Sequence, residues 1–107
     1  MVNYDMGVEG LARLRAEGAA HTVLDIREPQ EVAICAIADS LCIPMQQIPQ
    51  HLESLERDHP LVVLCHHGMR SDMVAEFLRN NGFENAWNLD GGIDAWARLI
   101  EPEMARY

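Results

Sequence analysis

Residues 61–71 read LVVLCHHGMRS, and this stretch decides how the chain folds. Its first four residues are apolar and two are valines, which is typical of a short strand buried on both faces. His66, His67 and Gly68 then end the strand, because Gly68 permits a backbone turn that a Cβ atom would resist. A helical pattern follows from Ser71, and its apolar side would carry Met73, Val74, Phe77 and Leu78.

Cys65 ends the predicted strand and is a candidate reactive thiol. The thiolate is the nucleophilic form, whereas a free cysteine is mostly protonated at pH 7. The helix N-terminus, the N–H groups of the loop, the charge of Arg70 and the hydroxyl of Ser71 would all favour a thiolate or an anionic substrate. The alternative is a buried cysteine that merely ends a strand. The close spacing of Gly68, Arg70 and Ser71 favours the reactive thiol.

Three motifs, in the same order along the chain, resemble those of the rhodanese-like sulfurtransferases. Residues 65–71 are similar to the C-x-x-G-x-R-S active-site loop of that family. LDIREPQE at 24–31 resembles D-x-R-E-P-x-E, and NLDGGIDAW at 88–96 resembles L-x-G-G-x-x-x-W. Ile43-Pro44 also matches, so the resemblance covers about residues 22–99. One segment departs from the family, since residues 36–40 read AIADS where H-I-P-G-A is usual.

The alternation of strand and helix patterns predicts an α/β domain with a mainly parallel sheet. The resemblance implies a rhodanese-like three-layer domain, with five strands flanked by helices. We expect one domain over residues 1–107, with residues 101–107 as a loose tail. We expect strands over residues 2–4, 22–26, 40–43, 61–64 and 86–89, and helices over 8–18, from Pro29, from Ser71 to a cap at Gly82, and over 93–100, with two helical pieces between 45 and 55 separated by Pro49.

The resemblance also implies which residues form the site. Cys65 and Arg70 would be catalytic, and the substrate would lie against His66, His67, Gly68, Met69 and Ser71. Asp25, Arg27, Gly91 and Gly92 would support the loop from neighbouring strand ends. From residue chemistry alone, Asp25 and Arg27 are better explained as a charge pair that pins a loop. Two consecutive glycines would let the backbone at 91–92 approach the Cys65 loop closely.

By resemblance, the function would be transfer of sulfane sulfur from a donor such as thiosulfate to cyanide or a thiol, through a Cys65 persulfide. The acceptor could also be a protein. Two alternatives stay open. Phosphatases and arsenate reductases of related fold have C-x-x-x-x-x-R loops, one residue longer than the loop between Cys65 and Arg70. Non-catalytic modules of the family often lack the cysteine, which this chain keeps.

Composition excludes several classes of function. The net charge of −9 argues against nucleic acid or an anionic membrane as a partner. All basic residues are arginines, so Schiff-base chemistry and a nucleotide phosphate loop, which need lysine, are excluded. The N-terminal residues lack the pattern of a signal peptide, which favours the cytoplasm. We expect no cofactor.

A metal site is not expected, because adjacent residues such as Cys65, His66 and His67 rarely converge on one ion. Cys35 and Cys42 form no C-x-x-C pair, and small core residues are the better explanation for both.

Overall fold

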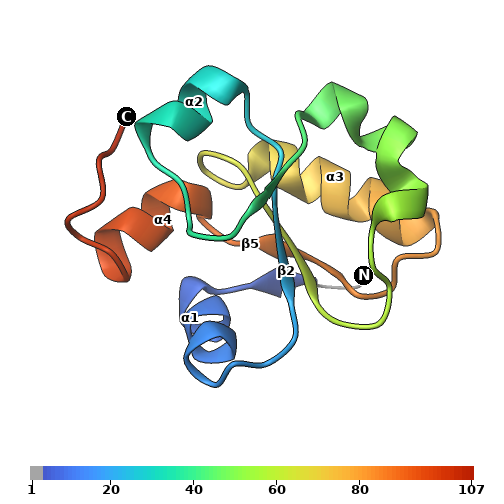
Figure 1. Ribbon diagram of the computed structural model, residues 1–107, viewed down its shortest axis with the longest axis horizontal. Helices are drawn as coiled ribbons and strands as arrows, with labels where there is room; N and C mark the ends of the chain where they lie inside the picture. Colours follow the sequence, from blue (N-terminus) through green and yellow to red (C-terminus); the bar gives the residue numbers. More distant parts are fainter. Residues whose placement is uncertain (1–3) are drawn as a thin grey trace.

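Strands and helices alternate along residues 4–107, which the computed structural model describes (Figure 1). The strands are β1 (Asp5–Met6), β2 (Thr22–Asp25), β3 (Leu41–Cys42), β4 (Leu61–Leu64) and β5 (Ala86–Leu89). The α-helices are α1 (Val8–Ala16), α2 (Pro29–Ile34), α3 (Met69–Asn80) and α4 (Gly92–Leu99), with the 3₁₀ helix η1 (Met45–Ser54) between β3 and β4. Of the strand predicted at residues 2–4, Val2 and Asn3 lie outside the described residues. Among residues 4–107, no helix is long and apolar enough to cross a membrane.

All strand pairs are parallel, in the order β1-β5-β4-β2-β3. β4 lies at the centre and all four of its residues are buried, as its apolar run predicted. Of its neighbours, β2 ends at Asp25, and β5 is followed closely by Gly91-Gly92. Because the carboxyl ends of parallel strands share one edge of a sheet, these residues lie at the same edge as Cys65. The predicted α/β fold with a parallel five-stranded sheet is confirmed.

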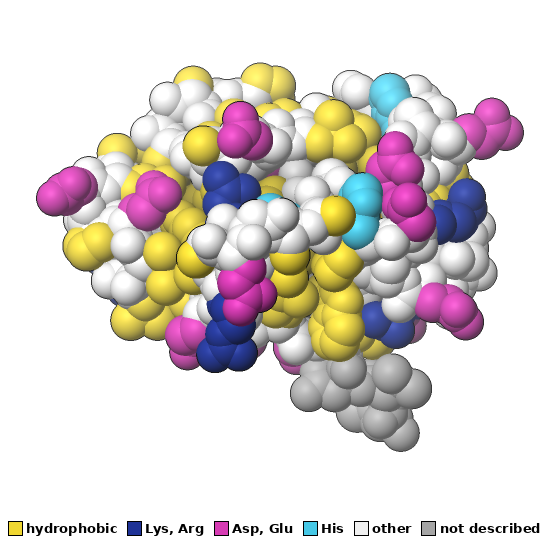
Figure 2. Space-filling view, turned by 60° about the horizontal axis from the view of Figure 1, so that its bottom comes forward, with side chains coloured by type: hydrophobic (Ala, Val, Ile, Leu, Met, Phe, Trp, Pro, Cys, Tyr) yellow, Lys and Arg dark blue, Asp and Glu magenta, His cyan; other side chains and the backbone are white. Residues whose placement is uncertain are grey.

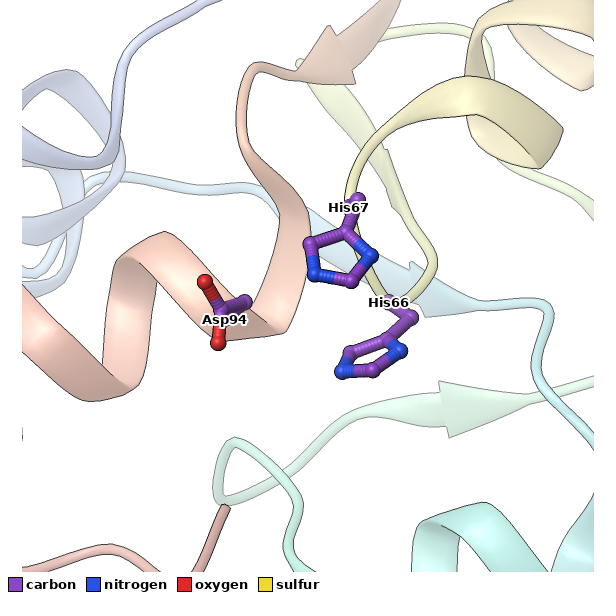
Figure 3. Close-up of side chains that lie close together, drawn as sticks. All are labelled: His66, His67 and Asp94. Carbon is purple, nitrogen blue, oxygen red and sulfur yellow. The ribbon is translucent and has the colours of Figure 1, made fainter. Parts of the chain in front are cut away.

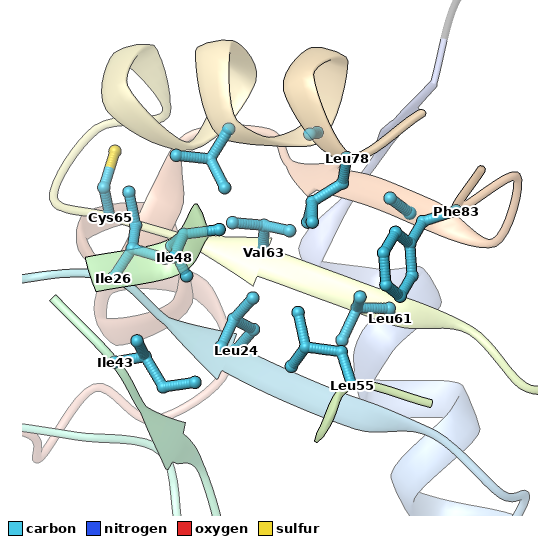
Figure 4. Close-up of a cluster of buried hydrophobic side chains, with 13 residues drawn as sticks. Leu24, Ile26, Ile43, Ile48, Leu55, Leu61, Val63, Cys65, Leu78 and Phe83 are labelled. Carbon is cyan, nitrogen blue, oxygen red and sulfur yellow. The ribbon is translucent and has the colours of Figure 1, made fainter. Parts of the chain in front are cut away.

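Two hydrophobic clusters cover the two faces of the sheet. On one face, α1 and α4 pack against Val62 and Leu64 of β4. On the other face, α3 and η1 pack against Leu61 and Val63, and Cys65 belongs to this second cluster (Figure 4). The division follows from the alternation of side chains along a strand. The thiol of Cys65 therefore lies on the side of the sheet that carries α3 and η1.

The apolar side predicted for α3 is wrong in part. The buried residues of this helix are Ser71, Val74, Ala75 and Leu78. Met73 is 62% exposed and Phe77 is 37% exposed. The helix starts at Met69 rather than Ser71, and the buried hydroxyl of Ser71 finds hydrogen-bond partners at the sulfur of Cys65 and at Asn88. That anchor turns Val74 inward and leaves two large apolar side chains outside.

Two turns resolve differently from expectation. Between residues 45 and 54 the chain forms one continuous 3₁₀ helix instead of two pieces, because the φ angle of Pro49 fits such a helix. In the 36–40 turn, Asp39 adopts a left-handed φ of 66° at the position where the family usually has glycine. Ser40 closes that turn by donating its N–H and hydroxyl to the Ile37 carbonyl. An aspartate tolerates this conformation better than most residues, so the turn survives without Pro-Gly.

Candidate active site

The loop between β4 and α3 wraps around the sulfur of Cys65. Gly68 takes a left-handed φ of 108°, which turns the backbone inward. The N–H of Gly68 donates to Cys65 Sγ at 3.1 Å, and the N–H of Ser71 donates to it at 3.4 Å. The Ser71 hydroxyl lies 3.3 Å from the same sulfur. The residue itself is only 2% exposed. Backbone donors at a helix N-terminus therefore surround the sulfur, as the loop sequence predicted.

This environment alters the acidity of the thiol. Burial raises the pKa of Cys65, but hydrogen bonds from the Ser71 hydroxyl and from the backbone N–H groups of Ser71, Gly68 and Arg70 lower it. The net result is a pKa below the ordinary value for cysteine. Donors to the sulfur stabilise the charged form more than the neutral one. The loop therefore increases the thiolate fraction near neutral pH.

A hydrogen-bonded chain extends from the sulfur to the edge strand β1. The Ser71 hydroxyl lies 2.5 Å from Asn88 Oδ1, and Asn88 Nδ2 donates to Asp5 Oδ1 at 3.0 Å. A hydroxyl has one proton, so Ser71 can donate to sulfur or to Asn88, but not to both at once. An ionised Cys65 attracts that donation, whereas a neutral thiol leaves it with Asn88. Asn88 was not singled out from the sequence, because a polar residue ending a strand has many ordinary explanations.

The Gly91-Gly92 pair brings α4 against the Cys65 loop, as predicted. The N–H of Ile93 donates to the Cys65 carbonyl at 2.9 Å, and the N–H of Asp94 donates to the His66 carbonyl at 3.0 Å. Gly92 has a φ of 60°, and a Cβ atom there would lie 2.5 Å from both of these carbonyl oxygens. Only glycine allows this approach without displacement of the loop.

Asp25 and Arg27 form the predicted charge pair. Both are buried, and Arg27 Nη2 lies 2.7 Å from Asp25 Oδ2 while its Nε donates to Oδ1 at 2.9 Å. The remaining donors of the guanidinium reach the carbonyls of Glu31 and Cys35. The pair therefore fixes the segment between β2 and α2, and its contacts with the Cys65 loop pass through other residues.

Arg70 lies in a different arrangement from the one expected of a substrate-binding cation. Its guanidinium donates to both carboxylate oxygens of Glu31 on α2, at 3.0 and 2.9 Å. These bonds from Arg70 lower the pKa of Glu31 to about 2, although burial acts in the opposite direction. The positive charge at the loop is thus offset by Glu31. Sequence reasoning missed Glu31 as a site residue, although it ends the 24–31 motif.

Tyr107 shows that the expectation of a loose tail is wrong. Residues 101–107 contain no helix or strand, yet the Tyr107 hydroxyl donates to Glu31 Oε2 at 2.9 Å and lies 3.1 Å from Arg27 Nη1. Its ring stacks on His66 at 3.9 Å, and its backbone oxygen lies 2.8 Å from His66 Nε2. The tail therefore packs against the loop. No periodicity or motif around Tyr107 signals this contact.

His66, His67 and Asp94 lie together beside the loop (Figure 3). Their potential ligand atoms are all within 4.8 Å of one another. The expectation that Cys65, His66 and His67 do not converge is therefore wrong for the two histidines, which meet Asp94 instead of Cys65. His66 and Asp94 already have protein partners, however. The two Asp94 oxygens accept from Arg98 and Arg106, and His66 Nε2 contacts the Tyr107 backbone. Burial raises the pKa of Asp94, but the ion pairs with Arg98 and Arg106 lower it. The net result is a pKa below the ordinary value for aspartate.

Met69 and the two other cysteines differ in how far they are exposed. Met69 is 81% exposed at the start of α3 and does not enclose the sulfur. Cys35 is half-buried, whereas Cys42 is exposed on the edge strand β3, so the expectation that both belong to the core is wrong for Cys42. Neither forms a disulfide.

Comparison with known proteins places this site in a family. The sequence pattern of the family described as "Rhodanese-like domain" matches residues 8–99. A thiosulfate sulfurtransferase GlpE from Vibrio cholerae is 39% identical over 83 residues, covering 78% of this chain and 77% of that protein. A sulfurtransferase from Allochromatium vinosum is 36% identical over 107 residues, covering 96% and 99%. The crystal structure of a rhodanese-related protein from Thermoplasma volcanium is 36% identical, with a TM-score of 0.80 over 88% of this chain and 90% of that one. The chain belongs to the rhodanese-like domain family.

Proposed function

We propose that this protein is a sulfurtransferase that moves sulfane sulfur from a donor such as thiosulfate to cyanide or a thiol through a persulfide on Cys65. The observation that carries the proposal is the set of N–H and hydroxyl donors around Cys65 Sγ, which lowers the pKa of that thiol. A nucleophile needs such activation because the neutral thiol reacts poorly. Relatives named as thiosulfate sulfurtransferases support the same chemistry.

In the first half of the proposed reaction, the Cys65 thiolate attacks the outer sulfur of thiosulfate. A new S–S bond forms, the S–S bond of thiosulfate breaks, and sulfite leaves with the electron pair. The product is a Cys65 persulfide, whose charged outer sulfur the loop N–H groups would stabilise. In the second half, cyanide attacks that outer sulfur, thiocyanate leaves, and the electron pair returns to Cys65 Sγ.

Arg70 would orient the anionic donor and offset its charge. Glu31 already engages its guanidinium, so donor binding would compete with, or add to, this ion pair. Replacing Arg70 with alanine is expected to lower kcat/KM for thiosulfate sharply. Arg70→Lys is expected to restore only part of it, because an ammonium group lacks the planar fork that pairs with an oxyanion.

The loop argues against a phosphatase or arsenate reductase. It has one residue fewer between Cys65 and Arg70 than the phosphatase pattern, so its cradle is smaller. We expect no measurable hydrolysis of an aryl phosphate. A purely non-catalytic module would have no need of the donors that surround the sulfur.

The test is thiocyanate formation from thiosulfate and cyanide, compared across cysteine variants. Cys65→Ser is expected to abolish transfer without unfolding the protein, while Cys35→Ala and Cys42→Ala retain it. A Cys65→Ser protein that keeps most of its activity would assign the chemistry to another cysteine. The proposal includes a cytoplasmic location, which is consistent with three unpaired cysteines because reducing compartments keep thiols free.

A further inference from the structure

An apolar groove lies between η1 and α3. Its walls are Met45 and Pro49 on the η1 side and Met73 and Phe77 on the α3 side, with Ile48 and Val74 also lining it. Its volume is about 240 Å³. The described residues of the groove carry no charged side chain, which sets it apart from the other hollows around the loop.

The groove exposes side chains that the sequence pattern assigned to the core. Met73 and Phe77 are 62% and 37% exposed. Met69, one helical turn before Met73, is 81% exposed. Residues four apart share one face of a helix, so these three side chains form an exposed apolar stripe along α3. Methionine side chains are flexible and polarizable, which suits a surface that adapts to a partner.

The floor of this groove and the reactive sulfur belong to one hydrophobic cluster. Ile48 and Val74, which line the groove, belong to the same hydrophobic cluster as Cys65 (Figure 4). At its other end, the stripe begins at Met69, directly after the loop that surrounds the sulfur. The hollow that Tyr107 lines, by contrast, lies against Ile93 and Cys35, residues associated with the opposite hydrophobic cluster. A molecule seated in the groove would therefore reach the loop from the side that Tyr107 leaves uncovered.

The surroundings of the stripe are acidic. Asp72 and Glu76 are exposed on α3, one residue before Met73 and Phe77 respectively. A second hollow, with a volume of about 280 Å³, lies beside the loop and is lined by His67, Met69, Asp72 and Asp90 among others. The whole chain carries a net charge of −9, and Figure 2 shows carboxylates spread across one face with fewer arginines among them. The field here repels anions and attracts cations.

We propose that the groove docks a polypeptide sulfur acceptor whose cysteine lies among apolar and basic side chains. The inference rests on the proposed sulfur transfer and identifies the class of its acceptor. Apolar side chains of the partner would fill the groove, and its arginines or lysines would face Asp72 and Glu76. A second copy of this chain is a poor occupant, because two such acidic surfaces repel each other.

Sulfur transfer from Cys65 to the acceptor needs no further oxidant or reductant. The acceptor thiol loses its proton to solvent, and its thiolate attacks the outer sulfur of the Cys65 persulfide. A new S–S bond forms on the acceptor while the S–S bond on Cys65 breaks. The electron pair returns to Cys65 Sγ, which regains its thiolate and its hydrogen bonds from Gly68 and Ser71.

Binding to the Cys65→Ser protein tests the groove independently of catalysis. The probe is a fluorescein-labelled peptide with a central serine, flanked by leucines and arginines, and its match has glutamates in place of the arginines. Fluorescence anisotropy is expected to show at least about tenfold tighter binding of the basic peptide, and at least about a tenfold loss when Met73→Ser and Phe77→Ser are combined. Leu99→Ser, at a residue 61% exposed on α4, is the matched control and should leave binding unchanged.

Transfer to the cysteine form of the basic peptide provides the second measurement. With the thiosulfate-treated protein, the ratio of its rate to the rate with cyanide should fall at least about tenfold in the Met73→Ser, Phe77→Ser variant. Equal binding of both peptides, or binding unaffected by the double variant, would overturn the groove inference. So would sedimentation that shows a wild-type dimer dissociated by the same substitutions, because the occupant would then be a second copy. Normal peptide binding without any persulfide on Cys65 would instead refute the proposed function alone.

Discussion

Replacing Gly92 with alanine is the substitution whose cost the structure defines most sharply. Gly92 has a φ of 60°, and an added Cβ would lie 2.5 Å from the carbonyl oxygens of Cys65 and His66. Those two carbonyls accept hydrogen bonds from the N–H groups of Ile93 and Asp94, which join α4 to the Cys65 loop. To relieve the clash, α4 and the loop must separate, and both hydrogen bonds would lengthen or break.

The expected loss of folding free energy in Gly92→Ala has two parts. An L-residue in the left-handed region costs about 1 kcal/mol relative to glycine. Two weakened backbone hydrogen bonds cost about 1 kcal/mol each, which brings the total to about 3 kcal/mol. For a domain of this size, we therefore expect the melting temperature to fall by about 12 °C or more.

Gly18→Ala is the matched control. Gly18 has a φ of 66°, but no atom lies within 4 Å of the Cβ that it would gain. That variant has the strain of the left-handed conformation without the clash, so we expect its melting temperature to fall by only about 5 °C. Calorimetry or circular dichroism would measure both proteins. Melting temperatures within about 2 °C of each other would refute the close approach of α4 to the loop.

Three further predictions concern the site and its support. Ser71→Ala should raise the pKa of Cys65, because a hydroxyl donor to the sulfur is lost. The rate of Cys65 alkylation as a function of pH would show this rise. An unchanged pH dependence would mean that the hydroxyl stays with Asn88. Asp39→Gly should stabilise the protein by about 0.5–1 kcal/mol in urea unfolding, because it removes left-handed strain, and destabilisation would contradict this. Glu31→Gln should lower the free energy of unfolding at pH 7, because the ion pair with Arg70 is lost. The expected decrease is only about 1 kcal/mol, because Arg70 is partly exposed and solvent screens its attraction to Glu31. The pKa of Glu31 is lowered from 4.5 to about 2, so the wild-type advantage should be complete above pH 4.5 and fade as the pH falls toward 2; a difference as large at pH 3 as at pH 7 would speak against the ion pair.

The sheet and the sulfur cradle were predictable because both arise from local sequence. An uninterrupted apolar run such as Leu61–Leu64 can be satisfied only by burial on both faces, which places it in the middle of a parallel sheet. The loop that follows must turn at Gly68, and a helix start then directs N–H groups toward the preceding residue. The close approach of Gly92 was also predictable, because paired glycines at a strand end permit such an approach, although an ordinary turn into a helix was the alternative.

The electrostatic partners of the loop were not predictable, because they depend on contacts between distant segments. Glu31 meets Arg70 across two helices, and Tyr107 reaches His66 from the end of a segment without regular structure. The exposed side of α3 was also missed. Apolar periodicity assigned Met73 and Phe77 to the core, whereas the hydrogen bonds of buried Ser71 set the rotation of the helix. A polar residue with partners can outweigh an apolar one in orienting a helix.

Mass spectrometry of the intact protein after exposure to thiosulfate tests the central claim most directly. The wild-type protein is expected to gain the mass of one sulfur atom, which peptide mapping should locate on Cys65 and which cyanide should remove. The Cys65→Ser protein is expected to gain none, although its Cys35 and Cys42 remain free. A wild-type protein that gains no sulfur, or one that carries it on Cys35 or Cys42, would contradict the assignment of Cys65 as the residue that accepts and passes on sulfur.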